Sequence, residues 1–509
     1  MAEEQGAQRA YRAPCPGCGA PVEFRSAQST FAVCPYCRST VVRDGDKLSR
    51  VGKMSELFDD FSPLQLFASG RIGGEPFTLI GRLQYAYPGG RWTEWIAAFA
   101  DSDARTGVLS EDNGAFVFST PVVLDRVAPP PDALRIGART AFNGQSYTVA
   151  SNEQVTLVSA QGELPRLPAL GTPFAVVELR SDKGEVLSLD YGSEGAQPPV
   201  ASLGRAVLLD DLQLAGLRDA SATEEKGRAF NCPNCGSPVT VNLADSKSIA
   251  CGNCHSIIDL TQGIGGELRH AEQDAPVQPL IALGSIGQLQ GQPWQVVGFQ
   301  HRLGVESGQV DDDSEHFGWN EYLLYNRKRG FSFLVDSEDG WSMVAPTTGA
   351  PTTPGNGKTA RYLGKTYTQQ SAYDAETSYV AGEFYWRVER GQKSFNRDFS
   401  SGASLLSMEK TANEITWSLG SRIDSAAIAT AFKLDKRKDL FKRGDAAPLS
   451  AASGLGCGTI VLIAVVIVVL LIILSTCSNR SGSGSGGYAG SSRSSGGSYG
   501  GYSSGGGHK

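Results

Sequence analysis

Eight of the ten cysteines in this 509-residue chain fall into four C-x-x-C pairs, and the pairs form two sets with the same spacing. Each set reads C-x₂-C-x₁₅-C-x₂-C, which brings four thiolates together at the tips of two hairpins. Zn²⁺ binds four thiolates as a closed tetrahedron with no position left for a substrate. The pattern therefore predicts two zinc ribbons with two structural zinc ions per chain. The predicted ligands are Cys15, Cys18, Cys34 and Cys37 in the first ribbon and Cys232, Cys235, Cys251 and Cys254 in the second.

Two other kinds of site also contain C-x-x-C turns. A thioredoxin-like redox pair would be a single C-x-x-C within a βαβ pattern, and a rubredoxin-type site holds iron. The N-terminus has no pattern of a secretory signal peptide, so we expect a reducing compartment, where paired cysteines are metal ligands more often than disulfides. His255 directly follows Cys254 and is a further candidate ligand. Because four thiolates already complete the shell, zinc held by cysteines alone is favoured.

Patterns typical of catalytic sites are missing. The sequence contains no H-E-x-x-H, G-x-S-x-G or G-x-x-x-x-G-K-[ST] motif, and its five histidines form no repeated pair. Repeated carboxylates are interpreted as structural groups bonded to backbone or arginine, with anchors of a binding site as the alternative. They are Glu94 with Glu321, Glu163 with Glu383, and Asp190 with Asp398. We therefore expect no enzymatic activity and assign no catalytic residue.

The chain is duplicated well beyond its cysteines. Every cysteine of the first set recurs 217 positions later, and Gly81 recurs as Gly298 at the same displacement. Short runs rich in aromatic and β-branched residues alternate with turn residues, which predicts antiparallel strands. The predicted fold is mainly β, with zinc ribbons at 1–45 and 228–262 and two duplicated antiparallel domains, each a meander or partly open barrel, at 60–217 and 277–435. Short helical segments are expected near 206–214 and 426–432, and the acidic insertion at 311–315 is interpreted as surface.

An uncharged segment near the C-terminus predicts one transmembrane helix. Residues 455–476 contain no charged side chain, and a helix of that length measures about 33 Å against a hydrocarbon core of about 30 Å. Residues 479–509 are rich in Gly and Ser, which predicts a disordered tail. Basic residues before the segment predict a single-pass, tail-anchored protein of the cell membrane, with cytoplasmic N-terminal domains and a short C-terminal tail outside. The basic residues that precede the segment are Lys433, Lys436, Arg437, Lys438, Lys442 and Arg443.

The length of the chain indicates its domain number, and its charge argues against one class of function. A chain of 53.9 kDa exceeds what one hydrophobic core supports, so several domains are expected. The net charge of -7 and the pI near 5.5 argue against a nucleic-acid-binding protein, which needs a basic surface. We therefore expect partner proteins at the cytoplasmic membrane face and no nucleic acid.

Several repeated motifs resemble a known bacterial family. The motifs are G-x-P-F-x-L-I-G at 74–81 and G-x-P-W-x-V-V-G at 291–298, W-T-E-W at 92–95 and W-N-E-Y at 319–322, and Gly-Glu at 162–163 and 382–383. They look like domain of unknown function 4178 in two tandem copies that together cover more than half of the chain. Arg166 stands where the second copy has Trp386, so the second copy is closer to the family pattern. The resemblance also implies an accompanying zinc ribbon and a C-terminal membrane span.

The resemblance carries no activity and no catalytic residue, because the family has none established. Its members tend to be encoded beside membrane-stress proteins of the phage-shock type and beside polyamine aminopropyltransferase-like proteins, which implies a role in a membrane-stress system. We therefore expect a membrane-anchored cytoplasmic scaffold or adaptor with structural zinc ribbons. The alternative is a small-ligand sensor or enzyme that uses a pocket in each β-rich domain. An enclosed cavity lined by the repeated carboxylates in both copies would favour the alternative, and filled domains would favour the scaffold.

Overall fold

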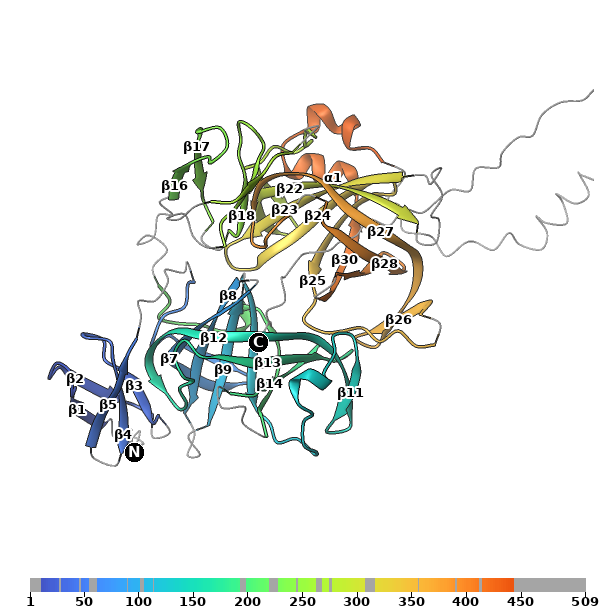
Figure 1. Ribbon diagram of the computed structural model, residues 1–509. Coiled ribbons are helices and arrows are strands. Elements are labelled where there is room, and N and C mark those ends of the chain that lie inside the picture. Colours follow the sequence, from blue (N-terminus) through green and yellow to red (C-terminus); the bar gives the residue numbers. More distant parts are fainter. Residues whose placement is uncertain are drawn as a thin grey trace, which may run out of the picture.

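The computed structural model describes residues 11–26, 29–44, 47–54, 62–88, 90–100, 105–112, 114–192, 198–218, 228–243, 246–261, 268–273, 277–306, 316–355, 357–389, 391–411 and 414–443 (Figure 1). Within these residues, no helix combines the length and apolar character needed to cross a membrane. The predicted span at 455–476, the predicted tail at 479–509 and the acidic insertion at 311–315 lie outside the described residues.

The first half of the chain forms ribbon 1 (residues 11–53) and barrel 1 (residues 62–218). Ribbon 1 contains β1 (Tyr11–Pro14), β2 (Pro21–Phe24), β3 (Phe31–Val33), β4 (Ser39–Asp44) and β5 (Lys47–Lys53). Barrel 1 contains β6 (Ser69–Ile72), β7 (Glu75–Tyr87), β8 (Gly90–Phe99), β9 (Thr106–Asp112), β10 (Ala115–Pro121), β11 (Arg139–Phe142), β12 (Gln145–Leu164), β13 (Pro173–Arg180), β14 (Glu185–Asp190) and β15 (Val200–Val207), with the 3₁₀ helices η1 (Pro131–Ala133) and η2 (Leu209–Leu212).

The second half repeats this order as ribbon 2 (residues 228–271) and barrel 2 (residues 277–443). Ribbon 2 contains β16 (Arg228–Asn231), β17 (Pro238–Val241), β18 (Ser248–Ala250), β19 (Ile257–Asp259) and β20 (His270–Ala271). Barrel 2 contains β21 (Ile286–Leu289), β22 (Gln292–Glu306), β23 (His316–Asn326), β24 (Gly330–Ser337), β25 (Gly340–Pro346), β26 (Thr359–Tyr362), β27 (Lys365–Phe384), β28 (Lys393–Ser401), β29 (Ser404–Lys410), β30 (Ile415–Ile423), the helix α1 (Ser425–Ala431) and the 3₁₀ helix η4 (Asp435–Phe441).

Each barrel is a closed ring of antiparallel strands. The order in barrel 1 is β12-β13-β14-β15-β10-β9-β8-β7, and β7 pairs with β12 to close the ring. Barrel 2 has the order β27-β28-β29-β30-β25-β24-β23-β22, closed by pairing of β22 with β27. The predicted mainly β, antiparallel fold is therefore confirmed, but the ring is complete rather than partly open. Closure is possible because β12 and β27 are 20 residues long and pair with a different barrel strand on each side.

Along most of β8 and β23 both faces are buried, because side chains alternate between the barrel interior and an outer covering. In barrel 1, Trp95 on β8 points outward and packs in a core cluster with Leu209 and Leu212 of η2. In barrel 2 the same outer position is Tyr322, which shares a cluster with residues of α1 and η4. The short helices near the ends of both copies thus supply the cover that keeps these strands out of water.

Each ribbon is joined to its barrel by strand pairing. The last three residues of β12 pair with β3 of ribbon 1, with Gly162 opposite Val33. In the second half β27 pairs with β18 of ribbon 2, with Glu383 opposite Ile249. One long strand therefore runs from the barrel wall into the ribbon in both halves of the chain.

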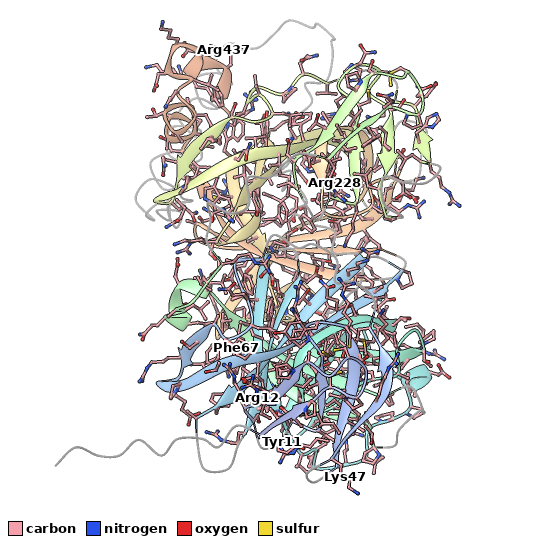
Figure 2. All side chains as sticks on the ribbon, turned by 90° about the vertical axis from the view of Figure 1, so that its left-hand side faces the viewer. Tyr11, Arg12, Lys47, Phe67, Arg228 and Arg437 are labelled. Atoms are coloured by element: carbon pink, nitrogen blue, oxygen red, sulfur yellow. The ribbon has the colours of Figure 1, made fainter. Side chains whose placement is uncertain are left out.

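The two barrels stack head to tail. At one end of barrel 1, the backbone of Gly114 lies against that of Gly330, which begins β24. The backbone N–H of Ala350 donates to the carbonyl of Ser181 at this same end. Figure 1 shows barrel 2 above barrel 1 with β26 reaching down toward β11, and in the turned view of Figure 2 Lys47 of ribbon 1 lies far from Arg437 of η4. Barrel 1 therefore covers one mouth of barrel 2 and keeps its own corresponding mouth on the opposite end.

Candidate functional site

The four cysteines of each predicted ligand set converge. In both sets all four sulfur atoms lie within 4.8 Å of one another, and none of the eight forms a disulfide. A tetrahedron with Zn–S bonds of about 2.3 Å has S–S edges of about 3.8 Å. The Sγ–Sγ distance is 3.7 Å for Cys15–Cys37, Cys18–Cys34, Cys232–Cys254 and Cys235–Cys251. The donor chemistry and the geometry are therefore compatible with two structural zinc ions.

Each C-x-x-C pair sits in a tight turn that presents backbone N–H groups to sulfur. The N–H of Gly17 donates to Cys15 Sγ at 3.3 Å, and the N–H of Asn253 donates to Cys251 Sγ at 3.5 Å. The residue after the second cysteine of every pair has a positive φ, an uncommon conformation for residues other than glycine. These residues are Gly19 (φ 77°), Arg38 (φ 59°), Gly236 (φ 73°) and His255 (φ 60°). His255 does not join the sulfur cluster but places Nδ1 3.2 Å from the Tyr379 hydroxyl of barrel 2.

The repeated Glu163 and Glu383 fasten the ribbons to the barrels. The Glu383 carboxylate accepts the backbone N–H groups of Asn242 (2.8 Å) and Leu243 (2.9 Å) and the Ser246 hydroxyl (2.7 Å). Glu163 accepts the backbone N–H of Ser26 at 2.9 Å. Burial raises the pKa of Glu163, and its hydrogen bonds from the ribbon oppose that rise. Both carboxylates are therefore structural clamps, in agreement with the interpretation as groups bonded to backbone.

A glycine precedes each clamp because two strands cross closely there. Gly162 and Gly382 have φ of 76° and 83°. A Cβ at Gly162 would lie 2.3 Å from the Ile80 carbonyl oxygen, and one at Gly382 would lie 2.3 Å from that of Val297. The repeated Gly-Glu motif thus marks the point where the long strand passes from barrel to ribbon.

The repeated Trp-x-Glu motif points into each barrel. In barrel 2 the Trp319 indole N–H donates to Glu321 Oε1 at 2.6 Å, and Glu321 has no exposed surface. In barrel 1 the Trp92 indole N–H donates to Glu94 Oε1 at 3.3 Å. Burial raises the pKa of Glu321 to about 7, although the Arg302 guanidinium opposes the rise. These two glutamates are therefore interior groups rather than surface carboxylates.

A second interior carboxylate accompanies each of these glutamates. The strand register places Asp190 opposite Val176 in barrel 1 and Glu409 opposite Asn396 in barrel 2, at corresponding positions. Asp398 instead lies opposite Ser407, where barrel 1 has Glu178 opposite Ser188. The predicted pairing of Asp190 with Asp398 is therefore wrong, because β28 and β29 are aligned by their hairpin and not by the spacing of acidic residues along the chain.

The two barrels neutralise this carboxylate pair with arginines from different positions. In barrel 2 the Arg302 guanidinium lies 2.9 Å from Glu409 and 3.9 Å from Glu321, with no exposed surface. The register places Tyr85 at that strand position in barrel 1. There, Arg166 pairs with Asp190 and its side chain is 48% exposed. No repeated sequence pattern indicates Arg302, because its repeat position holds a tyrosine in the first copy.

A cavity of about 60 Å³ remains inside barrel 1. Glu94, Asp190 and Arg166 line it together with the hydroxyls of Ser110 and Ser188. In barrel 2 the register puts larger side chains at three cavity-lining positions, where Phe333 replaces Val108, Val335 replaces Ser110 and Val344 replaces Ser119. These three side chains pack in one core cluster with Trp386, which occupies the place of Arg166. Barrel 2 is therefore filled at the positions where barrel 1 is open.

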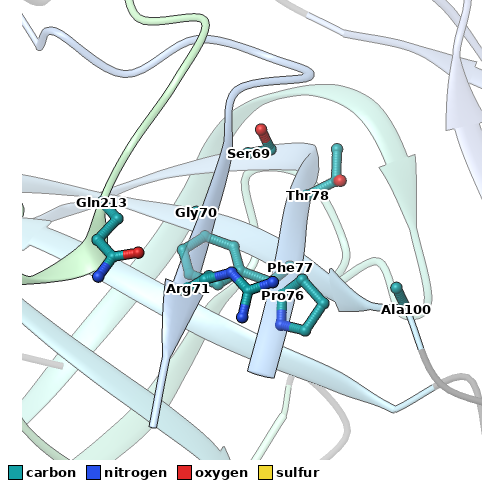
Figure 3. Close-up of a pocket in the computed structure, with 8 residues that line it drawn as sticks. All are labelled: Ser69, Gly70, Arg71, Pro76, Phe77, Thr78, Ala100 and Gln213. Carbon is teal, nitrogen blue, oxygen red and sulfur yellow. The ribbon is translucent and has the colours of Figure 1, made fainter. Parts of the chain in front are cut away.

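A larger groove of about 260 Å³ lies on the outside of barrel 1 (Figure 3). It is lined by the β6–β7 hairpin, including Arg71 and Phe77, and by Gln213 after η2. Arg71 is the sole titratable residue in its lining, and the guanidinium donates to the Gly74 carbonyl at 2.8 Å. In barrel 2 the Phe432 ring that follows α1 approaches Gly287, the counterpart of Gly70 in this lining. The groove therefore carries none of the repeated carboxylates.

The family comparison agrees with the duplicated architecture. The model described as a domain of unknown function (DUF4178) matches residues 68–208 and again residues 282–425, together more than half of the chain. The two matches fall on the two barrels, and a cysteine cluster precedes each of them. Comparison with curated proteins and with solved structures gives no match. The chain therefore belongs to the DUF4178 family and carries two tandem copies of its domain.

Proposed function

We propose that this protein is a non-enzymatic scaffold that presents two ribbon-barrel units to partner proteins at the cytoplasmic face of a membrane. The observation that supports the proposal is that three of the repeated carboxylates are engaged in contacts within the protein. Glu163 and Glu383 hold ribbons, and Glu321 is fully buried against Trp319 and Arg302. Side chains that a duplicated enzyme would keep available for substrate are thus engaged inside the protein.

The two cysteine clusters support this role as structural zinc sites. Four thiolates close the coordination shell, so the metal would hold the ribbon together and offer no position to a substrate. A ribbon of this length has too small a core to fold by itself, and zinc binding supplies the missing folding free energy. The zinc ions therefore belong to the scaffold and not to a reaction.

Membrane attachment is proposed for the uncharged residues 455–476. The segment contains no ionisable residue of the kind that intramembrane function requires, which supports the role of a simple anchor. The basic residues at 433–443 precede it and support a cytoplasmic position for both units.

Affinity purification of the full chain from detergent-solubilised membranes tests the scaffold. We expect specific partner proteins that are retained by the full chain and lost when both ribbons are destabilised by Cys34→Ser with Cys251→Ser. Specific recovery of no protein at all would contradict the proposal.

An exchange of the membrane segment tests the anchor. Replacement of residues 459–476 by an unrelated apolar helix of equal length should preserve membrane localisation and partner recovery. Deletion of the segment should release soluble protein that still holds its metal. An exchanged chain that reached the membrane without its partners would show that the helix itself recognises them.

A sensor role is the second candidate, and one observation favours it in barrel 1 alone. The small cavity beside Glu94 and Asp190 is a space that barrel 2 fills with its own side chains. The expectation of one pocket in each β-rich domain is not supported at the filled positions of barrel 2.

A further inference from the structure

The comparison of the two interiors points to a ligand for barrel 1. Both barrels hold a pair of carboxylates at corresponding positions, Glu94 with Asp190 and Glu321 with Glu409. In barrel 2 a side chain of the protein itself, Arg302, inserts a guanidinium between them. Barrel 1 has a tyrosine at that strand position and retains a cavity. Barrel 2 thus has the arrangement of a site occupied by a tethered guanidinium.

We propose that barrel 1 binds a small organic cation, with a guanidinium or alkylammonium group, in the cavity beside Glu94 and Asp190. The cation would take the place that the Arg302 guanidinium takes in barrel 2. A cavity of about 60 Å³ accommodates roughly four water-sized groups, which matches a head group of four or five heavy atoms.

Two hydroxyls support a polar ligand independently of the carboxylates. Ser110 and Ser188 are 2% and 7% exposed, line the cavity, and have Oγ atoms with no hydrogen-bond partner among the described residues. Buried hydroxyls normally find a partner, so two unpaired ones around one space indicate that a hydrogen-bonding group enters it. Barrel 2 has Val335 at the Ser110 position and so lacks this hydroxyl.

The charge of the site favours a cation over an anion. Two carboxylates line the cavity with one arginine, so the lining carries an excess of negative charge when all three are ionised. Arg166 pairs with Asp190 from the mouth, and its side chain remains 48% exposed. An anion would have to overcome the field of Glu94 at short range in a poorly solvated space.

Access to the two barrels differs because of the head-to-tail stack. Trp386 is 1% exposed and packs beside Tyr385 at the mouth of barrel 2 that faces barrel 1. The corresponding mouth of barrel 1 lies on the end away from barrel 2 and carries Arg166. A ligand can therefore reach barrel 1 past a long, half-exposed side chain, whereas barrel 2 is sealed by an aromatic one.

Methylguanidinium and its neutral analogue methylurea provide the test with the full chain in detergent. Binding is followed by calorimetry and by methyl NMR of labelled valine, with Val108 and Val200 as reporters in the cavity lining. We expect saturable binding of methylguanidinium at least tenfold tighter than that of methylurea, with shifts at these valines and none from acetate. Binding of acetate in preference to the cation, equal binding of the two analogues, or no saturable binding would overturn the proposal.

Substitutions locate the site. Glu94→Gln keeps the shape and removes one charge, and Ser110→Val introduces the side chain that barrel 2 carries, so each should weaken binding at least tenfold. Glu321→Gln in barrel 2 is the matched control and should leave the affinity unchanged. Thermal unfolding of each variant shows whether it is folded. Binding that survived both barrel 1 substitutions in folded protein would place the cation elsewhere and contradict the assignment.

Discussion

Barrel 1 and barrel 2 contain the same inward-facing Trp-x-Glu motif but complete their interiors differently. Barrel 2 buries the triad of Arg302, Glu321 and Glu409 and seals it with Trp386. In barrel 1 the cation is Arg166, which lies at the mouth with a half-exposed side chain. A buried charge must be paired, but the partner can come from any neighbouring position, so duplicated folds are free to exchange it.

The head-to-tail stack also covers one barrel mouth and leaves the corresponding mouth of the other barrel uncovered. The mouth of barrel 2 that lies against barrel 1 is filled by the buried side chains of Tyr385 and Trp386. The matching mouth of barrel 1 has no second barrel against it. The copy closer to the family motif is thus the filled one, and the divergent Arg166 accompanies the open one.

The largest expected effect removes one metal site and leaves the other. Elemental analysis of protein purified without added metal should give two zinc per chain. Cys34→Ser and Cys251→Ser should each retain one, because structural zinc contributes roughly 10–16 kcal/mol to the folding of its own ribbon. Iron in place of zinc, or loss of both ions after one substitution, would contradict the assignment of two separate structural sites.

Replacing Arg302 should lower the free energy of unfolding more than replacing Arg166. Arg302→Met leaves two buried carboxylates without their cation and should lower the free energy of unfolding by about 3–5 kcal/mol. Arg166→Met leaves Asp190 without its cation but should cost less than Arg302→Met, because the half-exposed Arg166 lies at the mouth, where water can replace it. Urea unfolding followed by tryptophan fluorescence measures both. Equal losses for the two variants would remove the proposed distinction between a sealed and an open interior.

The clamps should couple each ribbon to its own barrel. Glu383→Ala removes the acceptor for two backbone N–H groups and the Ser246 hydroxyl, and charged hydrogen bonds contribute about 1.5–3 kcal/mol each. We expect several-fold faster zinc release from ribbon 2 to a chelator, with ribbon 1 unchanged. Glu163→Ala is the matched variant and should accelerate release from ribbon 1 alone. If either substitution accelerated both ribbons equally, the clamps would not act locally.

A pH dependence of stability should belong to barrel 2. Burial raises the pKa of Glu321 to about 7, above its usual value of 4.5. The unfolded chain therefore releases this proton at lower pH than the folded chain, so the contribution is complete below about pH 4.5 and is lost as the pH rises through about 7. The loss amounts to about 1.4 kcal/mol per pH unit in that window. Urea unfolding should show a weaker pH dependence in Glu321→Gln, and an unchanged slope would show that Glu321 is ionised throughout.

The sequence alone determined the features that depend on local spacing. The C-x₂-C-x₁₅-C-x₂-C pattern was sufficient to predict both cysteine clusters, because adjacent turns and short hairpins bring these residues together. The displacement of 217 residues revealed two copies, and the alternation of apolar residues indicated antiparallel strands. The repeated Glu163 and Glu383 were recognised as structural, although their partners in the ribbons were not.

Only the tertiary structure shows that each ring of strands closes, which charged residues pair, and which barrel interior is filled. Whether the strands form a meander or a ring depends on β12 and β27 reaching strands far away in the sequence. The true partner of Asp190 is set by hairpin register, which a count along the chain cannot follow across a changed loop. Arg302 and Arg166 come from unrelated positions of the repeat, and only the folded barrel brings each guanidinium to its carboxylates. The open space in barrel 1 has the same origin, because it results from several side chains on different strands being smaller together.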